Sequence, residues 1–102
     1  MDVMVYVSRL REAYSHLCDI FKPIRNSEDT EEIEVYLADD EVRGKFYDAL
    51  CVFGRALNMV MNSEKAYAAF EKAELGKYQS AFIFYSKVRR SVKIRYADMI
   101  DN

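Results

Sequence analysis

One long stretch decides the fold, residues 74–98, with the sequence ELGKYQSAFIFYSKVRRSVKIRYAD. Its apolar residues recur every three or four positions, which is the spacing of one helix face. The residues with this spacing are Tyr78, Phe82, Tyr85, Val88, Val92, Tyr96 and, just beyond the stretch, Met99. On a helical wheel of about 100° per residue, an arc of roughly 120° holds Phe84, Tyr85, Val88, Val92 and Tyr96. We therefore predict a long helix that buries this arc.

The other side of the predicted helix is basic. Lys87, Arg89, Arg90 and Lys93 fall there, and Arg95 falls at the edge of the apolar arc. Six basic residues and no acidic residue lie between positions 75 and 97, whereas positions 28–41 hold eight acidic residues and no basic one. The net charge of −2 therefore conceals an electrostatic polarity along the chain.

The composition is that of one globular domain. A chain of 102 residues, 51% hydrophobic and 31% charged, is long enough to bury a modest core. Only three Gly and one Pro are present, which favours long uninterrupted helices. No stretch reaches the ~18 apolar residues of a membrane span, and the start lacks a signal-peptide pattern. We expect a cytoplasmic protein without membrane contact, and a fragment of a longer chain, since both ends look cut.

The rest of the sequence predicts two more long helices and two short ones. The first long helix carries its apolar stripe at Val3, Val7, Leu10, Tyr14, Leu17 and Phe21 and ends before Pro23. A short acidic helix is predicted over residues 30–38, with Asp29 as a candidate cap. The second long helix covers residues 40–61, and a second short one residues 63–73, with Ala66, Tyr67 and Phe70 inward. The fold class is thus all-α, an antiparallel bundle of three long helices with two short connecting helices.

Three local features qualify this scheme. Gly54, inside the second long helix, indicates close approach by a neighbour, because Gly costs a helix about 1 kcal/mol relative to Ala. Residues 74–77 are either a turn at Gly76 or the first turn of the long helix. Cys18 and Cys51 have no C-x-x-C partner, and we interpret both as reduced, buried thiols.

Catalytic motifs are missing from the sequence. Gly44-Lys45 and Gly76-Lys77 lack the other residues of a phosphate-binding loop. His16, the only histidine, has only Glu12 or Asp19 nearby, so we interpret it as structural rather than as a metal ligand. The acidic run is best explained as solvated helix starts, with a metal cluster or an acidic docking surface as alternatives. We predict no catalytic, cofactor-binding or metal residue in this segment.

The basic side of the long helix is the one candidate contact surface. Its residues are Lys87, Arg89, Arg90, Lys93 and Arg95. It is either a solvated face or a contact for nucleic-acid phosphates or an acidic protein. No base-reading motif accompanies it, so any DNA contact is expected to be independent of base sequence.

Three stretches carry a resemblance to a known family. They are RLREAYSHLCDIFKPI at residues 9–24, FYDAL at 46–50 followed by Ala56-Leu57, and SVKIRYAD at 91–98. In these stretches the chain resembles the restriction (R) subunit of type I restriction–modification enzymes, in the helical region that follows the two motor domains. The similarity extends over nearly the whole chain.

This resemblance implies a parent protein that is an ATP-dependent, Mg²⁺-requiring DNA translocase and endonuclease. Its partners would be the methylation and specificity subunits, and double-stranded DNA through the parent protein. The catalytic and nucleotide-binding motifs of that family match no position here, so no cofactor is expected in this segment. The family's helical region is implied to dock the motor onto the methyltransferase core. Three hypotheses stay open: a docking bundle, a module contacting the DNA backbone, and a free-standing helical adaptor.

Overall fold

The computed structural model describes residues 2–24 and 30–101, apart from the side chains of residue 30 and residues 94–101. The elements are α1 (Val3–Ile20), a 3-10 turn η1 (Lys22–Ile24), α2 (Thr30–Tyr36), α3 (Asp40–Met61), α4 (Glu64–Ala68) and α5 (Lys72–Asp101). No strand occurs within these ranges. The predicted all-α class with three long and two short helices is confirmed.

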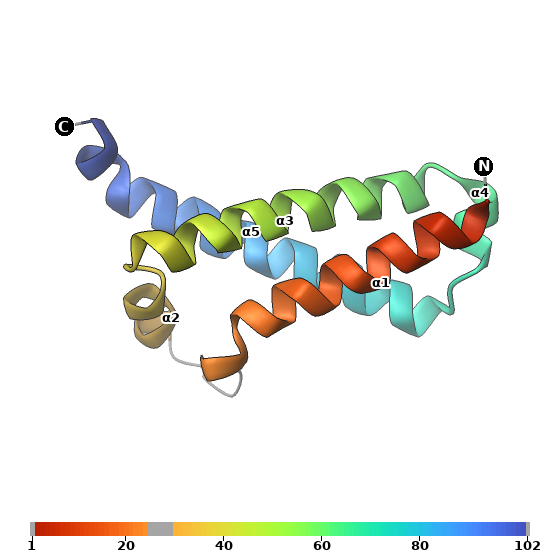
Figure 1. The fold of residues 1–102 in the computed structure, drawn as a ribbon, viewed down its shortest axis with the longest axis horizontal. Coiled ribbons are helices and arrows are strands. Elements are labelled where there is room, and N and C mark those ends of the chain that lie inside the picture. The colour runs from red at the N-terminus through yellow and green to blue at the C-terminus, as the bar shows by residue number, and fades with distance from the viewer. Residues whose placement is uncertain (1, 25–29, 102) are drawn as a thin grey trace.

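The long helices form an antiparallel bundle (Figure 1). α1 and α3 lie side by side in opposite directions and make the most extensive contact in the molecule, and α5 passes behind them in the direction of α1. α2 and α4 connect the long helices at opposite ends of the bundle. A helix of 30 residues is about 45 Å long at 1.5 Å per residue, so α5 matches the longest dimension of the molecule, 45 Å.

Aromatic side chains fill the space between the three long helices. Near the α4 end, Tyr14 of α1 lies 5.8 Å from Phe53 of α3 and 4.8 Å from Tyr78 of α5 between ring centroids. Near the α2 end, Phe21 lies 5.1 Å from Phe46 and 5.0 Å from Tyr85. Stacked, tilted and edge-to-face pairs of this kind stabilise a core beyond the area that they bury.

The helix starts follow from capping residues. Asp2 accepts a hydrogen bond from the Met4 amide, and Asp39 accepts bonds from the amides of Glu41 and Val42. Ser63 does the same for the Ala66 amide at α4. These side chains satisfy amide groups that the first helical turn leaves without partners. Asp29, the cap expected for α2, lies outside the described residues.

The first short helix, α2, is fixed by contacts that periodicity does not reveal. The Tyr36 hydroxyl donates a hydrogen bond to the Ile20 carbonyl, which ties α2 to the end of α1. Arg43 donates to the carbonyls of Leu37 and Ala38 at 3.0 and 3.1 Å, which ties α2 to α3. α2 is therefore held by polar contacts to the ends of two long helices.

Three sequence-based expectations are wrong at the second short helix and the cysteines. The helix expected over residues 63–73 ends at Ala68, because the chain turns there to bury Phe70 against Tyr78. Tyr67, expected inward, is 45% exposed, since so short a helix faces the core through Ala66. Neither cysteine forms a disulfide, but Cys18 is only partly buried and Cys51 is exposed, on the flank of α3.

The long helix also departs from its predicted pattern. It begins at Lys72, so Gly76 lies within its second turn, and the alternative of a turn at Gly76 is excluded. Phe84, which was predicted to lie in the buried arc, is 50% exposed. Its ring forms an edge-to-face pair with the neighbouring Tyr85, with centroids 5.1 Å apart. The rest of the predicted stripe is confirmed, since Tyr78 and Val92 are buried together with Leu75, and Phe82, Tyr85 and Val88 pack against the core. The side chains of Tyr96 and Met99 lie outside the described part of the chain.

A polar contact joins α1 to the first turn of α5. The Arg11 guanidinium donates two hydrogen bonds to the Glu74 carboxylate, at 2.9 and 3.1 Å, and the Tyr78 hydroxyl donates a third at 2.6 Å. The bonds from Arg11 and Tyr78 lower the pKa of Glu74 from 4.5 to about 2. Burial, followed by the bond to Glu74, raises the pKa of Tyr78 to about 12. These groups fix the position of α5 along α1.

The predicted close approach at Gly54 is confirmed and yields a test. A Cβ at position 54 would lie 2.8 Å from Cε2 of Phe82, whereas nothing lies within 4 Å of a Cβ at Gly44 or Gly76. We expect Gly44→Ala and Gly76→Ala to raise the free energy of unfolding by about 0.5–1 kcal/mol each. Gly54→Ala should lower it by about 1 kcal/mol, because displacing a packed ring costs roughly 1–3 kcal/mol. Urea denaturation of the three variants measures this; equal stabilisation by all three would contradict the contact.

A second prediction concerns stability in acid. Because the pKa of Glu74 is lower in the folded chain than its ordinary 4.5, its contacts stabilise the fold fully above about pH 4.5. This contribution is lost as the pH falls toward 2. Glu74→Gln should therefore flatten the dependence of unfolding free energy on pH between 4.5 and 2. Glu41→Gln is the matched control, since the Glu41–Lys45 pair is exposed and contributes little. Identical pH profiles for wild type and Glu74→Gln would contradict the assignment.

Candidate functional site

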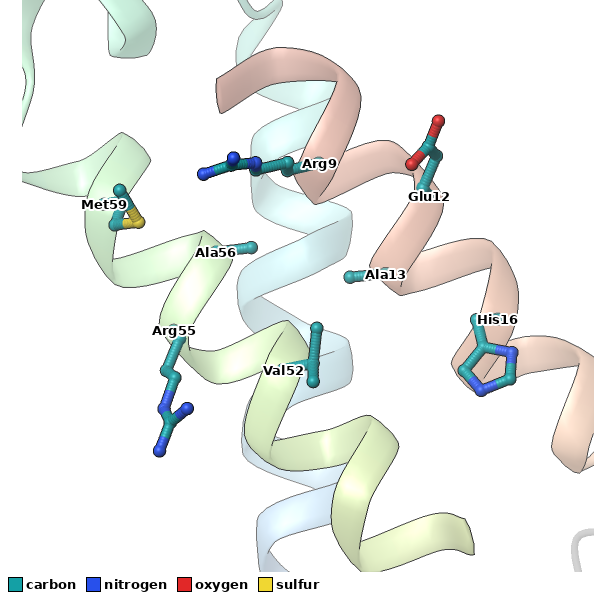
Figure 2. Close-up of a pocket in the computed structure, with 8 residues that line it drawn as sticks. All are labelled: Arg9, Glu12, Ala13, His16, Val52, Arg55, Ala56 and Met59. Carbon is teal, nitrogen blue, oxygen red and sulfur yellow. The ribbon is translucent and has the colours of Figure 1, made fainter. Parts of the chain in front are cut away.

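A shallow groove of about 490 Å³ runs between α1 and α3 on the side of this pair that faces away from α5 (Figure 2). Its floor is made by Ala13 and Ala56, whose methyl groups point toward one another across the groove. Val52 and Met59, which are 56% and 40% exposed, form an apolar wall on α3. Two small residues facing each other in paired helices leave a furrow of this kind, into which the ridge of a further helix fits.

Charged and polar side chains surround this apolar floor. Arg9 extends from α1 toward Met59, while Glu12 and His16 lie along the α1 edge (Figure 2). Arg55 leaves α3 on the flank that faces away from α1. An apolar centre inside a polar rim is the usual composition of a protein–protein contact surface, in which Met and Arg are enriched. The groove between α1 and α3 is thus suited to another protein rather than to catalysis.

A second groove, of about 310 Å³, lies between α3 and α5 on the other flank of α3. Its apolar floor is formed by Leu50, Gly54 and Phe82. Its polar lining consists of Cys51, Arg55, Asn58, Ser86 and Arg89. The Arg89 guanidinium lies over the Tyr47 ring, 5.3 Å from the ring centroid. This groove therefore brings together two arginines that are far apart in the sequence.

The predicted basic face of the long helix is exposed. Lys87, Arg89, Arg90 and Lys93 are all solvent-accessible on α5. Among the side chains that the structure describes, Lys87, Arg90 and Lys93 form no ion pair within 4.0 Å. Arg95, the fifth residue predicted for this surface, has no described side chain. Four of the five predicted contact residues therefore lie on an accessible surface of α5.

No metal centre emerges from the described part of the chain. Three or more His, Cys, Asp or Glu side chains do not come together there in a way that could hold an ion. His16 is exposed at the edge of the groove between α1 and α3. Asp39 caps α3 and Asp40 pairs with Arg43, so these members of the acidic run serve the start of a helix.

The pKa shifts of the core tyrosines have structural causes. Burial raises the pKa of Tyr14 to about 12, with a smaller effect from its hydrogen bond to Cys18. Burial also raises the pKa of Tyr85, aided by nearby Cys18. Both rings belong to the aromatic core and neither lines the groove between α1 and α3. These shifts therefore reflect packing rather than an acid or base prepared for catalysis.

Sequence reasoning missed both grooves. The sequence predicts that Val52, Arg55 and Met59 lie in the second long helix, but it singles out none of them. The available signal was the pair of alanines, Ala13 and Ala56, at inward positions of two helices. Periodicity alone does not tell which inward residues of two helices will face each other, so that signal was ambiguous.

Comparison of the chain with protein-family profiles, with curated proteins and with solved structures gives no match. Within the residues that the structure describes, no helix has both the length and the apolar character needed to cross a bilayer.

Proposed function

We propose that this chain is a non-catalytic docking bundle of a type I restriction R subunit, which holds the DNA translocase and nuclease against the methyltransferase core. The partner is the complex of methylation and specificity subunits. The family assignment rests on the resemblance at residues 9–24, at 46–50 with Ala56-Leu57, and at 91–98. The observation that carries the docking role is the apolar groove between α1 and α3, with Val52 and Met59 exposed.

The shape of the groove supports an elongated occupant. Ala13 and Ala56 allow a helix to approach closely, because helices pack at interaxial distances of about 8–10 Å set by the side chains at the contact. α5 already covers the other side of the α1–α3 pair. A helix of the methyltransferase core lying in the groove would extend the bundle by one member. Arg9 and Arg55 at its edges would favour acidic residues beside the partner's apolar stripe.

Substitution of the exposed apolar wall tests this proposal. We expect Val52→Glu and Met59→Glu to weaken capture of the chain by an immobilised methyltransferase core at least about tenfold, because a buried unpaired carboxylate opposes binding. Val35→Glu is the matched control, since Val35 is 75% exposed on α2, away from the groove. Affinity would be measured by biolayer interferometry, with circular dichroism to establish folding. Equal affinity of Val52→Glu, Met59→Glu and wild type would exclude this surface as the docking site.

The exposed bases on α5 favour a second candidate function, contact with the DNA backbone beside the motor. Lys87, Arg90 and Lys93 are accessible, and no ion pair engages them among the described side chains. Several lysines and arginines on one helix supply an affinity for phosphates that is independent of base sequence and falls steeply with salt. The two functions are compatible, since they use different surfaces.

Duplex binding as a function of salt tests the second candidate. We expect binding of a short duplex at low salt to be lost between about 50 and 200 mM NaCl. Arg89→Glu combined with Lys93→Glu should abolish it, whereas Lys65→Glu, which reverses a charge on α4, should leave most of it. Fluorescence anisotropy provides the measurement. A duplex affinity that does not change with salt, or that survives the double reversal, would rule out backbone contact by α5.

A further inference from the structure

The groove between α3 and α5 has the chemistry of an anion site. We propose that it binds a phosphate oxyanion through Arg55 and Arg89, with Asn58 and Ser86 as additional donors. Arg55 borders both grooves, but this inference does not depend on the docking proposal, because the floor of the anion site and its second arginine, Arg89, lie between α3 and α5. It also differs from general attraction by the basic helix, because it names a defined pocket with one residue of α3 and one of α5 at its centre.

The lining is rich in donors and contains no carboxylate. Its polar residues are Cys51, Arg55, Asn58, Ser86 and Arg89. Guanidinium groups donate through a planar fork that matches phosphate oxygens and accept nothing. An oxyanion in the groove would therefore meet donors from both helices without repulsion from the lining.

Two of the donors make described contacts that do not use their N–H groups. Arg89 lies over the Tyr47 ring at 5.3 Å, a position in which the ring face holds the guanidinium while its N–H edges stay available. Asn58 uses its carbonyl oxygen to accept a hydrogen bond from the Asn62 amide at 3.2 Å. Its own amide group is thereby left to donate. The contacts outside the groove thus leave donors, rather than acceptors, for an occupant.

Gly54 and Phe82 give the groove its depth. A Cβ at position 54 would meet the Phe82 ring at 2.8 Å, so the backbone of α3 and this ring lie in direct contact at the floor. The volume of about 310 Å³ exceeds the size of a single phosphate group and leaves room for the rest of a ligand. Such phosphate groups occur in small phosphate esters and in the nucleic-acid backbone. The donors of the groove match the phosphate group that both kinds of ligand share.

The test is a pair of NMR titrations of the 15N-labelled 102-residue chain, one with inorganic phosphate and one with a short DNA duplex, at constant ionic strength in NaCl. We expect saturable shifts of the Nε–Hε signals of Arg55 and Arg89. Arg55→Gln and Arg89→Gln should each weaken binding about tenfold, since a charge-assisted hydrogen bond contributes about 1.5 kcal/mol or more. Lys65→Gln, which removes one positive charge on α4, away from both grooves and from the basic side of α5, is the matched control and should weaken binding less than twofold.

The two titrations separate the sources of the phosphate. Saturable shifts with inorganic phosphate alone indicate a small phosphate ester, and shifts with the duplex at lower concentration indicate the nucleic-acid backbone. Either result supports the site if the Arg55 and Arg89 variants lose binding selectively. Equal weakening by Lys65→Gln, or no shift of the Arg55 and Arg89 signals with either probe, overturns the proposal. If a variant fails to fold, the Nε–Hε signals of Arg55 and Arg89 in the wild-type titration still show whether phosphate binds in the groove.

Discussion

The bundle depends on aromatic rings that each long helix contributes to a shared interior. Tyr14, Phe53 and Tyr78 meet near one end, and Phe21, Phe46 and Tyr85 meet near the other. Each group includes one ring from α3, one from α5 and one from α1 or the residue that ends it. Such groups fix the spacing of three helices at once, because moving one helix would disturb ring contacts on two sides. The missing side chain at Gly54, which admits Phe82, belongs to the same arrangement.

The packing of the three long helices leaves two grooves on the surface, one between α1 and α3 and one between α3 and α5. α5 closes one side of the α1–α3 pair and leaves the other side open, where Ala13 and Ala56 provide no bulk. Along the α3–α5 seam, side chains of the two helices meet at a floor of apolar residues with arginines above it. Arg55 borders both grooves. An occupant of either groove would therefore lie beside the same side chain of α3.

The sequence predicts where the long helices lie along the chain, but not which of their surfaces form grooves. Apolar spacing predicted the ends of the long helices to within about three residues, because this signal is local. Phe84 was misplaced because a helical wheel ranks positions around one helix without knowing where a neighbour lies. Arg55 and Arg89 could not be associated from the sequence, since only the packing of α3 against α5 brings them together.

The direction of the chain gives the bundle a mechanical property. With three long helices in alternating directions, Val3 and Asp101 come to lie at opposite ends of the 45 Å axis (Figure 1). A pull between these two points loads the helix contacts in shear, so that many ring contacts and the Arg11–Glu74 pair must slide together before any helix separates. A bundle whose ends emerge side by side would instead open one contact at a time under the same force.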